Sequence, residues 1–445
     1  MAVLSGEALS RADVAWLHAE APTNHFVVTS LSLLDSPLDV ERFKTMLSSR
    51  IELHPRLRQV VAETSIPFTP QRWIPARNFD LDAHVHRVAL PAPRGDAQLA
   101  AFIGDLVGQP LDFSRPLWEL FAVEGPGRAG AMVGRFHHSL GDGQAMVRML
   151  LSLTDETADG WKRSLKHRSA RTRHAVHDGR SSLARLLDEM PQVSRLARQA
   201  AAGAGALARM TLLDPDRRTP LRGDLTMLKA VAWTRPVPLG LVTTIARAAG
   251  ATVNDVIVSV VAGGLGEYLR DAGVETAGMR IRAMVPVNMR PPSDTGMTGN
   301  RFSLVYVELP VGISGAWERL MRVKIEMDRI KGSQEPLVGW LLVQGLGLLP
   351  TQLERLASSF YADKASLVLT NVIGPRRPIF MAGTPVRQMT FWEPESGGLG
   401  IGISIYSYAG EITVGVVSDR NLVAEPGQIT EAVMRALAAL SKEAS

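Results

Sequence analysis

The chain has 445 residues, which is enough for two or three domains that each bury a core. Hydrophobic residues make up 46% and charged residues 21%, and this balance excludes a largely disordered chain or a collagen-like repeat. The chain has no cysteine, which excludes disulfides, thiolate nucleophiles and cysteine-held zinc or iron–sulfur clusters. A covalent nucleophile would have to be Ser, Thr, Lys, Asp or Glu, and ten histidines are the candidate general bases.

The sequence also bears on location. Its first residues lack the apolar core of a signal peptide, and no apolar run reaches the roughly 18–20 residues that span a bilayer. The longest apolar run, 337–349, contains Gln344 and lies between Pro336 and Pro350. This run could form the wall of an acyl-chain pocket, a membrane-facing surface or an ordinary core helix. We therefore expect a cytoplasmic protein, with peripheral contact to the inner membrane or lipid inclusions as a further hypothesis.

The net charge of +5 is concentrated in one segment. Residues 162–222 carry fourteen Lys or Arg and five Asp or Glu, so this segment is +9 and the remainder of the chain is −4. We interpret 161–222 as a basic, partly helical linker between two domains, 1–160 and 223–445. It is either a solvated spacer or a surface for anionic lipid head groups. Aromatic residues are not interleaved with the charges, so no nucleic-acid partner is expected.

The N-terminal part alternates strand and helix patterns. We expect a strand at 25–34, a helix at 40–53, a hairpin from the apolar runs on either side of 126–130, and a helix from 144 that has Asp142 as its cap. The C-terminal part predicts helices near 253–273, 313–333 and 425–442. It also predicts strands near 281–290 and 300–309, a strand that runs into a turn at 365–375, and a hairpin that turns at Ala409–Gly410. Mixed elements on both sides of the linker indicate two α/β-type domains.

One short motif suggests chemistry. His137, His138 and Asp142 lie in the run HHSLGDG, where the histidines end a predicted strand. Neighbouring strand residues point to opposite faces, so only one histidine can face a cavity as a base. Alternatively, both histidines are buried and satisfied by the backbone, and Asp142 only caps a helix.

Metal or nucleotide binding has less support in the sequence. Adjacent strand residues diverge, so both histidines of the motif can hardly bind one ion, and no metal is expected. His84 and His86 share a strand face but have no evident third ligand. No GxGxxG or phosphate-loop pattern is present.

HHSLGDG resembles the HHxxxDG motif of CoA-dependent acyltransferases and condensation domains. Further segments resemble the bacterial wax ester synthase/diacylglycerol acyltransferase family in particular, and they occur in the family's order. These are PLDFSRPLWEL (110–120), TVNDVIVSVVAGGL (252–265), NRFSLVYVELP (300–310) and TNVIGPRRPIFMAG (370–383). The resemblance covers nearly the whole chain and is weakest at 160–222.

The resemblance implies an α/β (α+β) fold, with two chloramphenicol-acetyltransferase-like domains and mixed sheets around a central tunnel. It implies acyl transfer from acyl-CoA, as a substrate with no bound cofactor, to a long-chain alcohol or diacylglycerol. The product would be a wax ester or triacylglycerol. Alternatives are a condensation-like acyltransferase with another thioester donor or a glycolipid acceptor, and a lipid-binding relative without catalysis.

The resemblance also implies roles for single residues. His138 would be the general base, since the second histidine is the base in matching families, and Asn254 would donate to the oxyanion. The remaining motif residues at the reaction centre are His137, Asp142, Gly143 and Asp255. The expected substrate-binding residues are Pro116, Leu117, Trp118, Asn371, Gly374 and Pro375. Asp142 would be structural and paired with either Arg290 or Arg58. With no cysteine to carry an acyl group, we expect direct transfer without an acyl-enzyme.

Overall fold

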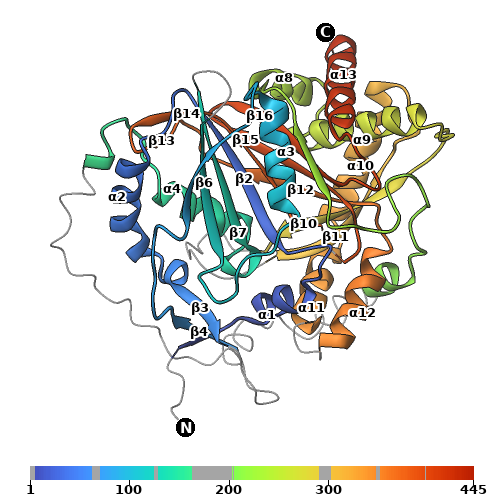
Figure 1. Ribbon diagram of the computed structural model, residues 1–445. Helices are drawn as coiled ribbons and strands as arrows, with labels where there is room; N and C mark the ends of the chain where they lie inside the picture. The colour runs from blue at the N-terminus through green and yellow to red at the C-terminus, as the bar shows by residue number, and fades with distance from the viewer. Residues whose placement is uncertain are drawn as a thin grey trace, which may run out of the picture.

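The computed structural model describes residues 6–62, 71–124, 129–162, 203, 205–289, 302–346, 351–395 and 397–444. Figure 1 shows two large sheets side by side, with helices around them. Most of the basic linker lies outside the described residues. The described part of the chain therefore leaves the domain ranges 1–160, 161–222 and 223–445 as a prediction.

The N-terminal sheet has six strands, and all neighbours except the last pair are antiparallel. Their order is β13 (Phe380–Met381), β14 (Thr384–Trp392), β2 (Val27–Leu34), β7 (Gly130–His137), β6 (Trp118–Glu124) and β5 (Val85–Ala89). The helices of this half are α1 (Arg11–Ala19), α2 (Val40–Arg50), α3 (Asp96–Val107) and α4 (Gly143–Ser152), and the short 3-10 helices are η1 (Ile51–Leu53), η2 (Pro55–Arg58) and η3 (His138–Leu140). A small separate sheet orders β1 (Glu7–Ala8), β4 (Arg72–Pro75) and β3 (Gln59–Ala62).

The C-terminal sheet has seven strands and is mixed. Its order is β11 (Phe302–Leu309), β10 (Ile281–Asn288), β12 (Leu367–Ile373), β15 (Ile401–Tyr408), β16 (Glu411–Asp419) and β8 (Lys229–Trp233), and β9 (Val237–Pro238) also pairs with β16. β12 runs parallel to both of its neighbours. The helices of this half are α8 (Leu239–Ala248), α9 (Val253–Asp271), α10 (Ala316–Lys331), α11 (Glu335–Leu346), α12 (Thr351–Ala362) and α13 (Gly427–Glu443). The predicted mixed α/β architecture is confirmed.

Many predicted elements are confirmed near their expected bounds. The strand at 25–34 is β2, the hairpin strands are β6 and β7, and the helix after Asp142 is α4. The last hairpin joins β15 to β16, and it turns where Ala409 and Gly410 both have positive φ angles of 48° and 85°. Such a turn matches the twist of the strands that it joins.

Two connections between the halves do not follow from the sequence pattern. β14 comes from the C-terminal half, yet it pairs with β2 along the N-terminal sheet, with Trp392 opposite Thr29. α3 comes from the N-terminal half, yet it packs on β8 of the C-terminal sheet, as its position in front of the sheets in Figure 1 agrees. These two connections fix the position of one sheet relative to the other and leave a space between them.

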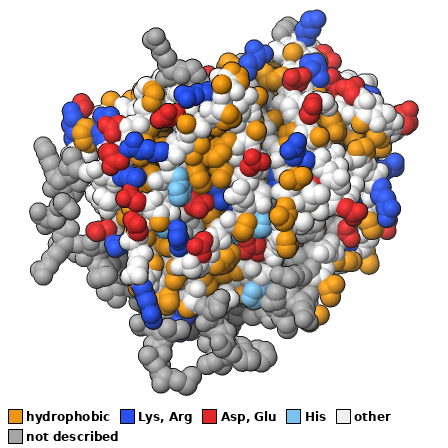
Figure 2. Space-filling model, viewed as in Figure 1, with side chains coloured by type: hydrophobic (Ala, Val, Ile, Leu, Met, Phe, Trp, Pro, Cys, Tyr) orange, Lys and Arg blue, Asp and Glu red, His pale blue; other side chains and the backbone are white. Residues whose placement is uncertain are grey.

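Charges are well mixed on the face seen in Figure 2, where acidic and basic side chains alternate without a large area of either sign. The described residues include no single helix that is long and apolar enough to cross a membrane. Only α8 and α9 taken together meet that test of length and composition, and they are bent by 98°.

The contact between α3 and β8 leaves no room for a side chain at Gly104. A Cβ atom there would lie 2.7 Å from the backbone oxygen of Lys229. Because overpacking a tight contact costs about 1–3 kcal/mol, Gly104→Ala should lower the free energy of unfolding by that amount in urea titrations. The control is Gly240→Ala on α8, where a Cβ meets nothing within 4 Å, so that this variant keeps or gains stability. Equal stability of the two variants would contradict this close packing.

Candidate active site

The motif histidines are held at the end of β7, where the two halves meet. His137 is the last residue of β7 and pairs with Val27 of β2, and the backbone N–H of His138 donates to the oxygen of Phe26 at 2.8 Å. The chain then turns through η3 into α4. The backbone of the motif is thus fixed by β2 on one side and by α4 on the other.

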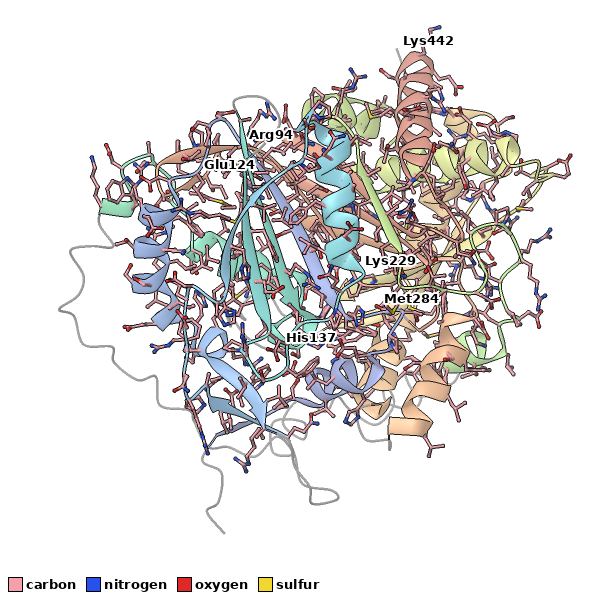
Figure 3. All side chains as sticks on the ribbon, viewed as in Figure 1. Arg94, Glu124, His137, Lys229, Met284 and Lys442 are labelled. Atoms are coloured by element: carbon pink, nitrogen blue, oxygen red, sulfur yellow. The ribbon has the colours of Figure 1, made fainter. Side chains whose placement is uncertain are left out.

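His138 faces a cavity between the two sheets. Its ring lies 4.8 Å from that of Trp16 on α1 and 6.4 Å from that of Phe302 on β11, measured between centroids. The cavity measures about 120 Å³, and residues of both halves line it, among them Asp142, Gly143, Met284, Asn288, Thr370, Asn371 and Glu393. Figure 3 labels His137 on β7 and Met284 on β10, which both lie in the middle of the molecule.

Two apolar cavities share walls with this one. One, of about 60 Å³, shares Trp16, Phe26, Met284 and Leu304 with it and extends to α11 and α12. The other, of about 50 Å³, shares Gly143, Val372 and Glu393 with it and extends under α4, where methionines and aromatic side chains line it. A polar centre with an apolar pocket on each side suits two substrates that each carry a long apolar chain.

His137 points away from the cavity and is fully buried. Its Nδ1 accepts a hydrogen bond from the backbone N–H of Ser139 at 3.1 Å, and the Ser139 hydroxyl lies 2.8 Å from the same atom. Burial, helped by the neighbouring His138, lowers the pKa of His137 to about 3. His137 is therefore a neutral residue that shapes the turn, which agrees with the expectation that only one histidine of the pair faces a cavity.

Asp142 caps α4 and also lines the cavity. Its Oδ1 accepts the backbone N–H of Ala145 at 2.9 Å, as expected for an aspartate before a helix. Of the two arginines considered as its partner, Arg290 lies outside the described residues. Arg58 is not its partner, because η2 carries Arg58 to the surface, where it lies over the Phe79 ring and 3.9 Å from Glu52.

Glu393 is the site residue that the sequence analysis missed. One of its carboxylate oxygens lies 3.4 Å from Nε2 of His138, and both side chains are about nine-tenths buried. Burial by itself lowers the pKa of His138, but hydrogen bonding and charge from Glu393, with smaller help from the His138 backbone and Asp142, raise it above the ordinary value. The signal in the sequence was faint: Glu393 and Glu395 follow a predominantly apolar segment, and no spacing links either of them to the histidines.

Of the remaining residues that were predicted for the site, the structure brings only some to the cavity. Asn371 lines it, and its Nδ2 donates to Oδ1 of Asn254 at 2.7 Å, so these two predicted residues do meet. Asp255, expected at the reaction centre, instead caps α9. Its carboxylate accepts the backbone N–H of Thr252 at 2.9 Å, in a reciprocal capping box.

Pro116, Leu117 and Trp118, which the resemblance assigns to substrate binding, are not among the residues that line these three cavities. Leu117 and Trp118 are buried in the N-terminal core, and the Leu117 oxygen accepts the backbone N–H of His137 at 3.0 Å. The indole of Trp118 donates to the Leu57 oxygen at 2.8 Å. The backbone of Leu117 thereby anchors the end of β7, which carries the histidines.

Gly374 and Pro375 also lie outside these cavities and form the turn after β12. The Gly374 N–H donates to the Ser407 oxygen at 2.9 Å, and a Cβ at Gly374 would be 2.5 Å from that oxygen. Only glycine fits so close to β15. These two residues therefore position β12, which carries Thr370 and Asn371 to the cavity.

Comparison with known families now places the chain. Residues 9–257 match the wax ester synthase/diacylglycerol acyltransferase catalytic domain, and residues 298–441 match the C-terminal domain of the same family. The chain belongs to this family. The resemblance given by the sequence motifs is thereby confirmed, and the chain is an enzyme of the acyltransferase class.

Relatives and solved structures agree with membership of the wax ester synthase/diacylglycerol acyltransferase family. A Mycobacterium tuberculosis protein named "probable diacylglycerol O-acyltransferase tgs1" is 29% identical, over 97% of this chain and 95% of its own. The structure of the wax ester synthase/diacylglycerol acyltransferase from Marinobacter aquaeolei VT8 superposes with a TM-score of 0.70 at 20% identity, and covers 98% of this chain and 99% of that one. The first condensation domain of the calcium-dependent antibiotic synthetase has the same fold, with a TM-score of 0.61 at 17% identity over 99% and 96% of the two chains.

The buried, neutral His137 predicts a pH dependence of stability. Unfolding exposes a histidine of ordinary pKa, so between about 6.5 and 3 the unfolded chain binds the extra proton and stability falls as the pH is lowered. For one group this loss approaches about 1.4 kcal/mol per pH unit. His137→Asn should therefore flatten the decline of the unfolding free energy between pH 6.5 and 4.5, measured by urea titration. His86→Asn on β5 is the control, and an equal slope in both variants would contradict the buried neutral state.

Proposed function

We propose that this protein transfers a fatty acyl group from acyl-CoA to the hydroxyl group of a long-chain alcohol or a diacylglycerol. The reaction proceeds by direct attack, with His138 as the general base. The observation that carries this proposal is the position of the His138 imidazole, which lines a cavity with one apolar pocket on each side. Family membership and the names of the mycobacterial relatives support the acyl donor and acceptor classes.

The proton balance of the reaction fits one histidine. The thioester is already activated, and the hydroxyl group ionises far above neutral pH, so a base must accept its proton as the oxygen attacks. The carbonyl carbon gains a bond to the acceptor oxygen and then loses its bond to sulfur. The proton held by His138 passes to the departing CoA thiolate, so the enzyme returns to its initial state. No side chain carries the acyl group.

The tetrahedral oxyanion requires a preorganised donor. Asn254 and Asn371 are the candidates, since their amides are already hydrogen-bonded to each other next to the cavity. Asn371 uses Nδ2 to donate to Asn254, which leaves the Nδ2 of Asn254 to donate to the oxyanion. In this proposal Asn371 therefore orients Asn254.

His138→Ala tests the base directly. We expect ester formation to fall by about 10²–10⁴-fold, because the variant lacks general-base catalysis, while the thermal unfolding profile stays close to that of the wild type. The measurement is thin-layer analysis of the products from labelled palmitoyl-CoA with hexadecanol or a diacylglycerol. Turnover near the wild-type level would refute the base assignment. Absence of neutral lipid from the wild type with either acceptor would instead favour a different thioester donor or a glycolipid acceptor.

Direct transfer has its own kinetic signature. Both substrates must be bound before chemistry starts, so initial rates at varied acyl-CoA and acceptor concentrations should give intersecting double-reciprocal lines. Parallel lines would indicate a covalent acyl-enzyme and would contradict direct transfer.

We also propose that the protein rests on a lipid surface, such as a membrane or a lipid droplet. Leucine and phenylalanine side chains on α11 and α12 are exposed beside the apolar pocket that these helices line: Leu337, Leu341, Leu353, Leu356 and Phe360. Exposed apolar side chains on two helices that line an apolar pocket fit contact with lipid. Most of the basic segment that could add attraction to anionic lipids lies outside the described residues.

A paired substitution tests this surface. Leu356→Glu with Phe360→Glu should reduce co-sedimentation with phosphatidylglycerol-containing vesicles severalfold, because apolar burial supplies part of the binding free energy. The control is Leu53→Glu, which changes a leucine of similar exposure on η1. Unchanged binding of the paired variant would mean that α11 and α12 do not contact lipid.

A further inference from the structure

Glu393 lies where three cavities meet. It lines the cavity of His138, the apolar pocket under α4, and a small cavity of about 20 Å³ that also contains Asn24, His25, Lys229 and Glu395. Glu393 directly follows β14, and the pairing of Trp392 with Thr29 fixes that end of β14 against β2. The backbone of His138 is held by the residue that precedes β2, so the two side chains approach each other from anchored positions.

The apolar side chains around Glu393 do not compensate a buried carboxylate for the loss of water. The pocket under α4 is lined mainly by Val28, Phe136, Met146, Met149, Leu150 and Phe391. A buried carboxylate in such a place is unfavourable unless an opposite charge or hydrogen-bond donors compensate for the lost water. The imidazole Nε2 of His138, 3.4 Å from the carboxylate, is the partner that can do so when it carries a proton.

We propose that Glu393 is a positioning residue for His138, whose carboxylate holds the imidazole toward the cavity and stabilises the imidazolium that forms when the acceptor hydroxyl gives up its proton. This inference rests on the proposed function, in which His138 is the base. Glu393 remains a carboxylate throughout. The proton moves from the hydroxyl oxygen to the imidazole of His138 and then to the thiolate sulfur.

The other charged groups around the pair do not replace Glu393. The charge of His138 disfavours a proton on the neighbouring His137, and Asp142 favours the imidazolium of His138. Around Glu393, the small cavity brings His25, Lys229 and Glu395 into its surroundings. The Lys229 ammonium is already paired, at 2.5 Å from Glu395 and 3.1 Å from Asp419, and Figure 3 shows Lys229 in the middle of the molecule. Glu393 is thus a carboxylate in ion-pair contact with His138, at 3.4 Å from Nε2.

The pair sets the pH range of activity. A protonated His138 cannot accept the hydroxyl proton, so kcat/KM rises with pH as the imidazolium loses its proton. Because Glu393 raises the pKa of His138, this rise occurs at higher pH than for an ordinary histidine. Without the carboxylate, burial lowers the pKa of His138, and only the smaller contributions of the His138 backbone and Asp142 oppose that effect.

Glu393→Gln tests the inference, because it keeps the size of the side chain and removes the charge. We expect the acid limb of kcat/KM to move to lower pH by about one unit or more, and the plateau to fall by about tenfold, since the imidazolium is no longer stabilised. Glu393→Asp keeps the charge and should retain most of the wild-type acid limb. The matched control is Glu20→Gln, which neutralises a carboxylate 3.9 Å from His137 and should leave the acid limb in place.

A second readout separates this inference from the proposed function. The titration of His138 is followed by NMR on protein labelled at histidine Cε1, with His138→Gln to identify the signal. A lower midpoint in Glu393→Gln than in wild type supports the inference even if no acceptor is turned over, an outcome that would refute only the proposed function. An unchanged midpoint and an unchanged acid limb in an active, folded Glu393→Gln variant would overturn the role of Glu393.

Discussion

Backbone hydrogen bonds between β14 and β2 join a strand from the second half of the chain to the sheet of the first half. Side-chain hydrogen bonds also join this strand to the C-terminal half: the Ser404 hydroxyl of β15 donates to the Phe391 oxygen, and the amide of Gln388 on β14 donates to the Thr234 oxygen at 3.1 Å. β14 therefore belongs to one sheet by its backbone and to the other by its side-chain contacts. Its end carries Glu393 to the imidazole of His138, and its position fixes the width of the cavity between the halves.

Two adjacent histidines of the same chain become chemically different because of this arrangement. His137 is enclosed by the N-terminal core and accepts hydrogen bonds at Nδ1, so it stays neutral and holds the turn. His138, one residue later, leaves the strand and meets a carboxylate from the other half of the molecule, so its imidazolium is favoured. The difference follows from the alternation of side chains at a strand end and from what each face contacts. The neutral partner also benefits the reactive one, because a second charge at His137 would oppose proton uptake by His138.

The features of the structure that depend on residues close in sequence could be predicted from the sequence. Periodicity and caps predicted β2, β6, β7, α4 and α9, and the HHSLGDG motif predicted one inward histidine with a helix-capping aspartate, because these features depend on neighbours within a few residues. The pairing of Glu393 with His138 depends on a strand that changes sheets, which no local pattern encodes. Trp118 was expected at the substrate and Asp255 at the reaction centre, yet Trp118 is buried in the core, where it pairs with Phe136 of β7, and Asp255 caps α9. Motif matching identifies residues that the fold needs, but it does not separate those that touch a ligand from those that hold the others in place.

The exchange of β14 also has a consequence for how the chain folds as it is synthesised. β2, β7 and β6 are complete early in translation, but the partner of the outer edge of β2 emerges only near residue 392. Until then, β2 is an edge strand made of almost entirely buried residues, and an unpaired apolar edge invites pairing with other chains. Contacts so distant in sequence form slowly. The nascent N-terminal half therefore passes through a long aggregation-prone interval, in which cellular chaperones would have a direct part in the yield of folded enzyme.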